Sequence, residues 1–127
     1  MASADKKRIL IVDDDACFAL VVKCALEGTG RYDVRWEEES FRAVRSARAY
    51  QPDLILLDLL MPGMDGAEAA SRLQADDALA RIPVIMLTAT LPRSCADAAE
   101  RVVAGRVFLA KPVSLEALLG CIEKNTQ

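Results

Sequence analysis

The sequence predicts an α/β fold, a doubly wound five-stranded parallel sheet with helices on both faces. Short apolar runs that could form buried strands alternate five times with segments whose apolar residues recur at helical spacing. The run at 54–57 is apolar throughout, as expected of a strand that helices cover on both faces. Because 127 residues can bury one core, we expect a single domain over 1–127, ordered at about 7–124, with no second domain.

Each predicted strand is a short apolar or β-branched run bounded by polar or turn-forming residues. The run at 8–12 reads RILIV and the run at 54–57 reads LILL, whereas the segment at 32–36 alternates only weakly. Polar residues that could carry chemistry follow four of the runs directly. The five predicted strands are 8–12, 32–36, 54–57, 84–87 and 107–110.

Two helices are predicted in the first half of the chain. The first has one apolar stripe at helical spacing, followed by glycines at 28 and 30 that favour its end. The second is predicted to start at Ser40 as its cap and to run to about Ala49, with Phe41 and Val44 turned inward. Arginines at 42, 45 and 48 lie along its other side, which predicts a solvated face. The stripe of the first helix is Phe18, Val21, Val22, Ala25 and Leu26.

Three helices are predicted in the second half, beginning with 67–74. Ser94 and Asp97 have the spacing of a capping box and precede an apolar stripe at helical spacing. Ser114 is predicted to cap the last helix. The stripe behind Ser94 is Cys95, Ala98, Ala99, Val102 and Val103, and that of the last helix is Leu115, Leu118, Leu119 and Ile122.

The composition excludes several classes of function. The net charge is -3 and no long basic run is present, so we expect no nucleic-acid partner. No stretch approaches a membrane span or resembles a secretory leader, so we expect a soluble, cytoplasmic protein with no membrane partner. The absence of histidine excludes Ser-His and Cys-His nucleophile pairs. The cysteines lack zinc-site spacing and are predicted to be reduced and largely buried: Cys17, Cys24, Cys95 and Cys121.

Polar residues at the strand ends form the candidate site. In parallel sheets of this kind, the carboxyl ends of the strands meet at one edge, where ligands bind. The carboxylates there would repel one another, and Mg²⁺, which prefers oxygen ligands, would offset this repulsion. Such a set suits phosphoryl transfer, with a carboxylate as the acceptor. The residues at this edge are Asp13, Asp14, Asp58, Thr88 and Lys111.

Four motifs together resemble the receiver domain of two-component response regulators over essentially the full chain. They are ILIVDDD at 9–15, DLILLDLLMPGMDG at 53–66, PVIMLTA at 83–89 and FLAKP at 108–112. Each motif alone is weak, whereas four in this order and spacing are specific. The resemblance implies the flavodoxin-like strand order 2-1-3-4-5. The segment 104–108 is about one residue shorter than usual in the family, and the fourth helix is expected to begin late, near Ser94.

The resemblance also implies a role for each site residue. Asp58 resembles the phosphoacceptor, Lys111 the residue that pairs with the phosphoryl oxygens, and Thr88 the hydroxyl donor. Phe108 matches the aromatic switch position, which moves together with the threonine, although its spacing alone favours a core residue. Asp15 is expected to neighbour the site without binding the metal. The implied Mg²⁺ ligands are Asp13 (mainly through water), Asp14, Asp58 and the Leu60 carbonyl, and the Ala89 backbone N–H would contact the phosphoryl group.

A stand-alone receiver of this kind would take its phosphoryl group from a histidine kinase or a histidine phosphotransfer protein. It would then switch a surface that binds a downstream protein, as a monomer or weak dimer. Beyond Mg²⁺-dependent self-phosphorylation and autodephosphorylation, it would not be an enzyme. Two alternatives stay open within the family: a receiver-like module that works without phosphorylation, and a receiver fragment of a hybrid kinase.

Two further readings require residues that the chain lacks. An aspartyl-phosphate hydrolase typically needs a second aspartate two residues after the nucleophile, where this chain has Leu60. A flavodoxin-type or Rossmann-type cofactor carrier needs glycines or hydroxyls after its first strand, where this chain has consecutive aspartates. The sequence therefore favours a signalling module over both.

Overall fold

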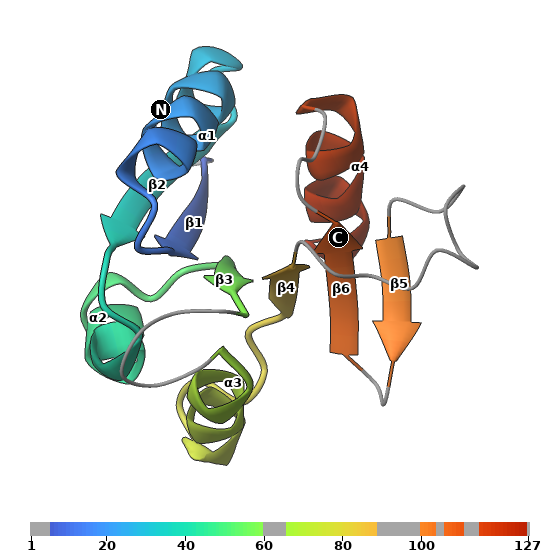
Figure 1. The fold of residues 1–127 in the computed structure, drawn as a ribbon. Coiled ribbons are helices and arrows are strands. Elements are labelled where there is room, and N and C mark those ends of the chain that lie inside the picture. The colour runs from blue at the N-terminus through green and yellow to red at the C-terminus, as the bar shows by residue number, and fades with distance from the viewer. Residues whose placement is uncertain (1–5, 60–65, 89–99, 104–105, 111–114, 127) are drawn as a thin grey trace.

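The computed structural model describes residues 6–59, 66–88, 100–103, 106–110 and 115–126, and Figure 1 labels their helices and strands. The strands are β1 (Lys7–Val12), β2 (Tyr32–Glu37), β3 (Leu54–Asp58), β4 (Val84–Thr88), β5 (Glu100–Val103) and β6 (Arg106–Ala110). The helices are α1 (Ala16–Gly28), α2 (Ala43–Tyr50), α3 (Gly66–Ala75) and α4 (Leu115–Asn125), with a 3-10 turn, η2, at Ser40–Arg42.

Five strands run parallel in the order β2-β1-β3-β4-β6. They correspond to the five predicted strands, and their order along the sheet is the expected 2-1-3-4-5. Figure 1 shows α1 and α4 on one side of the sheet and α2 and α3 on the other. The predicted fold class is therefore confirmed.

Alternation along the central strands divides the core into two layers, because successive side chains of a strand point to opposite faces of the sheet. Ile9 and Ile11 of β1 pack with α1 and α4, whereas Leu10 and Val12 pack with α2 and α3. All five residues of β3, from Leu54 to Asp58, are buried. This burial on both faces agrees with the continuous apolar run in the sequence.

The prediction was wrong at residues 100–103, where the apolar stripe behind Ser94 predicts a helix. These residues form β5, which pairs with β6 in the antiparallel direction and adds a sixth strand at the sheet edge. Val102 and Val103 are β-branched and favour strands. Only two residues separate Val103 from Arg106, and a connection this short joins antiparallel strands more readily than a helix to a parallel strand. The capping box at 94–97 lies outside the described residues.

The first helix, α1, buries a narrower stripe than the spacing predicts. Val22 and Leu26 are buried as expected, but Val21 is 68% exposed. The buried face is completed instead by Ala19. Gly30 follows the helix with a φ of 77°, a left-handed conformation that glycine adopts at little cost.

The second predicted helix differs from α2 at its start. Ser40 does not cap it, because Ser40 lies inside η2 and α2 begins only at Ala43. Phe41 is 59% exposed rather than inward. Ala43 and Ala47 form the buried face, and Val44 packs against it partly buried. The 3-10 turn shifts the helical phase, so positions counted from Ser40 are misplaced.

The prediction for the cysteines was wrong at two positions. Cys17 and Cys24 are exposed, whereas Cys121 is buried. Cys17 and Cys24 lie on the same side of α1 as Val21, the side that the wider stripe would have buried. Cys95 lies outside the described residues.

The last helix, α4, agrees with the prediction where the structure describes it. Leu118 and Ile122 are buried, and Leu119 packs against the same core cluster partly buried. Ser114 lies outside the described residues. Among the residues that the structure describes, no helix has the length and apolar character needed to cross a membrane.

Candidate functional site

The strand register places two carboxylates side by side at the carboxyl edge of the sheet. Val12 of β1 pairs with Leu57 of β3, and the next residues along the two strands are Asp13 and Asp58. Asp13 is 0% exposed and Asp58 is 7% exposed. Both acids follow runs that are buried by neighbouring strands and helices, so the fold withdraws them from solvent.

Hydrogen bonds on three sides hold Asp13. Its backbone N–H donates to the carbonyl of Glu37 at 3.0 Å. Its own carbonyl accepts from the indole N–H of Trp36 at 2.7 Å. Its Oδ1 accepts from the backbone N–H of Asp15 at 2.9 Å. The end of β2 therefore fixes the position of this acid, a role for Trp36 and Glu37 that no spacing in the sequence indicates.

Asp14 and Asp15 have different environments. Asp14 is exposed, and its carboxylate lies close to those of Asp13 and Asp58. Asp15 is the N-cap of α1, and its Oδ1 accepts from the Phe18 N–H at 3.2 Å. The Asp15 carboxylate is thus engaged in capping α1, whereas the Asp14 carboxylate lies at the site.

Gly66, the first residue of α3, packs against the backbone of Asp58 and Leu59. Its N–H donates to the carbonyl of Leu59 at 2.8 Å, directly after β3. A Cβ at position 66 would lie 2.6 Å from the Leu59 Cα and closer still to the Asp58 carbonyl oxygen. Only glycine allows α3 to begin this close to the end of β3.

The remaining predicted site residues occupy neighbouring strand ends or lie beyond the described part of the chain. Thr88 ends β4, one residue beyond Leu87, which pairs with Asp58. Phe108 in β6 pairs with Met86 and packs against the α2–α3 side of the core, partly buried. The three other predicted site residues, Leu60, Ala89 and Lys111, lie outside the described residues.

The acidic site, defined here as Asp13, Asp14 and Asp58, fits a divalent cation. One carboxylate oxygen from each residue can be chosen so that all three lie within 4.8 Å of one another. Three negative charges at this separation repel strongly where burial lowers the local dielectric. A hard cation such as Mg²⁺ takes oxygen ligands and keeps several waters, which suits two buried acids beside one that is open to solvent.

Comparison with known proteins places the chain in one family. The model of the response regulator receiver domain matches residues 9–123. Among curated proteins, the DNA-binding dual master transcriptional regulator RpaA of Synechocystis is 45% identical over 82 residues, which are 65% of this chain and 34% of RpaA. The DNA-binding response regulator MtrA of Mycolicibacterium paratuberculosis is 40% identical over 84 residues, 66% of this chain and 36% of MtrA. The match thus spans about a third of the length of these relatives.

Solved structures give the same result over nearly the whole chain. The receiver domain of a sensor histidine kinase from Pseudomonas aeruginosa has a TM-score of 0.79 at 29% identity, covering 95% of this chain and 98% of that one. That structure has a magnesium ion coordinated in its active-site cleft. The receiver domain of a histidine kinase from Syntrophus aciditrophicus has a TM-score of 0.77 at 34% identity, covering 94% and 89% of the two chains.

Proposed function

The chain belongs to the response regulator receiver domain family, and we propose that Asp58 accepts a phosphoryl group in a Mg²⁺-dependent reaction. The observation that carries this proposal is the grouping of Asp13, Asp14 and Asp58 within 4.8 Å at the carboxyl edge of a parallel sheet. Receiver domains are signalling domains that take phosphoryl groups from histidine kinases. The donor for this chain would be a sensor histidine kinase or a histidine phosphotransfer protein.

In the proposed reaction, a carboxylate oxygen of Asp58 attacks the phosphorus of the donor, the bond from phosphorus to the donor nitrogen breaks, and an acyl phosphate forms. The buried position of Asp58 at the end of β3 limits water around this acyl phosphate. The hydroxyl of Thr88 and the ammonium of Lys111 would stabilise the phosphoryl oxygens, together with the Ala89 N–H. Phe108 would follow the movement of Thr88 and pass the change to the surface.

Asp13, Asp14 and Asp58 would hold the metal, with the Leu60 carbonyl as a further ligand. When bound, Mg²⁺ supplies positive charge that offsets the repulsion between the acids and the incoming phosphoryl group. Asp13 contributes rigidity as well as charge, because both its backbone and its carboxylate are hydrogen-bonded to neighbouring residues. Asp13 is therefore already positioned before any ligand arrives.

Intact mass spectrometry after incubation with acetyl phosphate tests the proposal directly. We expect one phosphoryl addition to the wild type in the presence of Mg²⁺. The addition should disappear when Mg²⁺ is chelated and in Asp58→Asn, which keeps the shape of the side chain but removes its nucleophilic charge. A phosphoryl addition that persists in Asp58→Asn would identify another acceptor. No addition in the wild type would favour a receiver that works without phosphorylation.

A second candidate is a receiver that serves a hybrid kinase. The observation that favours it is that both solved relatives described above are receiver domains of histidine kinases. Such a receiver passes its phosphoryl group on to a histidine phosphotransfer protein, whereas a response regulator uses it to bind a target. Incubating the purified phosphorylated chain with phosphotransfer proteins separates the two, because only the relay loses its label to a histidine.

In this role the chain carries out phosphoryl chemistry and contacts other proteins. The curated relatives are named as DNA-binding regulators, but the matching segment covers about a third of each. We propose that the segment itself binds no nucleic acid, in keeping with its net charge of -3. An electrophoretic mobility assay on the phosphorylated chain tests this, and a shifted DNA band would contradict it.

A further inference from the structure

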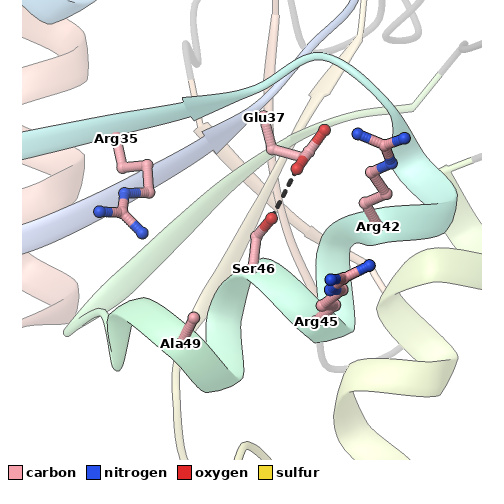
Figure 2. Close-up of a pocket in the computed structure, with 6 residues that line it drawn as sticks. All are labelled: Arg35, Glu37, Arg42, Arg45, Ser46 and Ala49. Atoms are coloured by element: carbon pink, nitrogen blue, oxygen red, sulfur yellow. Dashed lines mark hydrogen bonds between the residues drawn. The ribbon is translucent and has the colours of Figure 1, made fainter.

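A pocket of about 430 Å³ lies between the outer edge of β2 and α2, away from the acidic site. We call it the arginine pocket, because three arginines line it against one glutamate. Its volume is within the range of about 300–1,000 Å³ that is usual for small-molecule sites. Figure 2 shows its six lining residues: Arg35, Glu37, Arg42, Arg45, Ser46 and Ala49.

Two of the three guanidinium groups have no anionic partner among the described residues. Arg45 makes no hydrogen bond or ion pair with any described residue. Arg35 stacks over the ring of Tyr50 at 4.8 Å but meets no carboxylate of the described chain. Arg42 differs, because it forms an ion pair with Glu39 at 3.0 Å. The pocket therefore keeps unused hydrogen-bond donors on a protein whose net charge is -3.

The glutamate in the pocket does not neutralise these arginines. One oxygen of Glu37 accepts from the Ser46 hydroxyl at 2.5 Å, and the other accepts from the Glu39 backbone N–H at 3.0 Å. No guanidinium of the pocket lies within ion-pair distance of Glu37. The Glu37 carboxylate is thus hydrogen-bonded within the protein, and the guanidinium groups of Arg35 and Arg45 remain available to a ligand.

Figure 2 also shows how the charges are distributed. Arg35 lies on one side of the hydrogen-bonded Glu37–Ser46 pair, and Arg42 and Arg45 lie on the other. Positive ends with a negative centre suit a ligand with the opposite pattern. Arginine binds phosphate with two parallel hydrogen bonds, which gives strength as well as orientation. Each Glu37 oxygen keeps a second lone pair besides its bond within the protein, so hydroxyl groups in the middle of the ligand can donate to Glu37 and to the Ser46 oxygen.

We infer that the arginine pocket binds a small bisphosphorylated ligand, with a phosphate at each end and hydroxyl groups between them. Arg45 and Arg42 hold one phosphate, and Arg35 holds the other. A sugar bisphosphate has this chemistry. The site is separate from the acidic site, because its lining residues come from β2, η2 and α2 and include none of the acids that follow β1 and β3.

Isothermal titration calorimetry with fructose 1,6-bisphosphate as the probe tests this inference. The titration is done in low-salt buffer with a metal chelator, so that no phosphate is held by a metal at the acidic site. We expect saturable binding to one site. Replacing Arg45 with Gln or Arg35 with Gln should each weaken it by about tenfold, because each removes one charge-assisted phosphate contact. Fructose 6-phosphate, with one phosphate, should bind weaker by a similar factor.

Arg48→Gln is the matched control. Arg48 lies on the same helix as Arg45, but its guanidinium is already paired with Asp76 and does not line the pocket. Arg45 makes no hydrogen bond or ion pair with any described residue, so its replacement should leave the circular dichroism spectrum unchanged. Equal loss of binding in Arg48→Gln would mean general electrostatic attraction and overturn the inference. So would no binding to the wild type, or wild-type affinity in both pocket variants.

Discussion

The acidic site and the arginine pocket gather charge of opposite sign in opposite ways. Asp13 and Asp58 are buried and adjacent because a parallel register fixes them there. Arg42 and Arg45 are exposed and three residues apart around the first turn of α2, and Arg35 reaches the pocket from β2. Burial makes repulsion between the acids strong, whereas solvent screens the arginines. Repulsion between the buried acids therefore favours binding of a cation, whereas the screened arginines repel one another only weakly.

The two regions meet at the end of β2. Glu37 reaches into the arginine pocket with its side chain, while its carbonyl accepts from the N–H of Asp13 at 3.0 Å. Its neighbour Trp36 donates to the carbonyl of Asp13 at 2.7 Å. Two hydrogen bonds from the end of β2 thus connect the arginine pocket to Asp13, a buried residue of the acidic site. A change that moves Glu37 would reach Asp13 through backbone contacts alone.

Gly66→Ala should have the largest effect, because it disturbs the acidic site through its backbone. The added Cβ would lie 2.6 Å from the Leu59 Cα, so α3 or the end of β3 must move. Overpacking of this kind costs about 1–3 kcal/mol. Urea denaturation should show that loss, and acetyl phosphate labelling of Asp58 should slow. The arginine pocket should keep its ligand affinity, since Gly66 does not line it and the added Cβ would meet Asp58 and Leu59.

Gly120→Ala is the matched control for this substitution. Gly120 lies within α4, and a Cβ there would meet nothing within 4 Å. Alanine is favoured over glycine inside a helix by about 0.5–1 kcal/mol, so stability should rise. A Gly66→Ala protein as stable as the wild type would show that the end of β3 adapts more readily than its packing indicates.

The acidic site could be predicted because strand ends are readable in a sequence. Each strand that delivers a carboxylate contains a continuous apolar run, ILIV in β1 and LILL in β3, and an aspartate follows the run directly. The adjacency of Asp13 and Asp58 then follows from the parallel sheet. What could not be predicted is how Asp13 is held, because the indole of Trp36 reaches it from a strand with a weak pattern, 23 residues along the chain.

Helical phase and strand type were harder to predict. Counting from Ser40 placed Phe41 inward, but a 3-10 turn rotates the following residues relative to an α-helix. At 100–103, valines fit a helical stripe and a strand equally well by position, and pairing with β6 decides between them. The arginine pocket was foreseen only as a solvated face, because a third arginine comes from another element.

Trp36→Phe should have an intermediate effect and test the link between the two regions. It removes the indole N–H that donates to the Asp13 carbonyl at 2.7 Å, together with some packing volume. Losing such a bond costs about 1–2 kcal/mol. Urea denaturation should show this loss, and Mg²⁺ binding, followed by calorimetry, should weaken. Tyr32→Phe, at the other end of β2, is the control and should leave Mg²⁺ affinity unchanged. If Trp36→Phe bound Mg²⁺ as tightly as the wild type, the hydrogen bond from Trp36 would not matter for metal binding at Asp13.

Lys23→Gln should have the smallest effect, and it contrasts a charge that has a partner with the arginines that have none. Lys23 donates to Glu27 at 2.8 Å, and this hydrogen bond, ahead of all other causes, lowers the pKa of Glu27 from its usual 4.5. A lowered pKa in the folded state stabilises the fold above pH 4.5, and this contribution is lost as the pH falls through the folded value. Both side chains are more than a third exposed, which limits the effect at pH 7 to about 0.3–0.5 kcal/mol. Urea denaturation of wild type and variant should therefore differ at neutral pH and converge in acid.

Arg45→Gln should show no difference at either pH, because Arg45 has no partner to lose among the described residues. A loss of stability in Arg45→Gln equal to that in Lys23→Gln would mean that Arg45 serves the fold rather than a ligand.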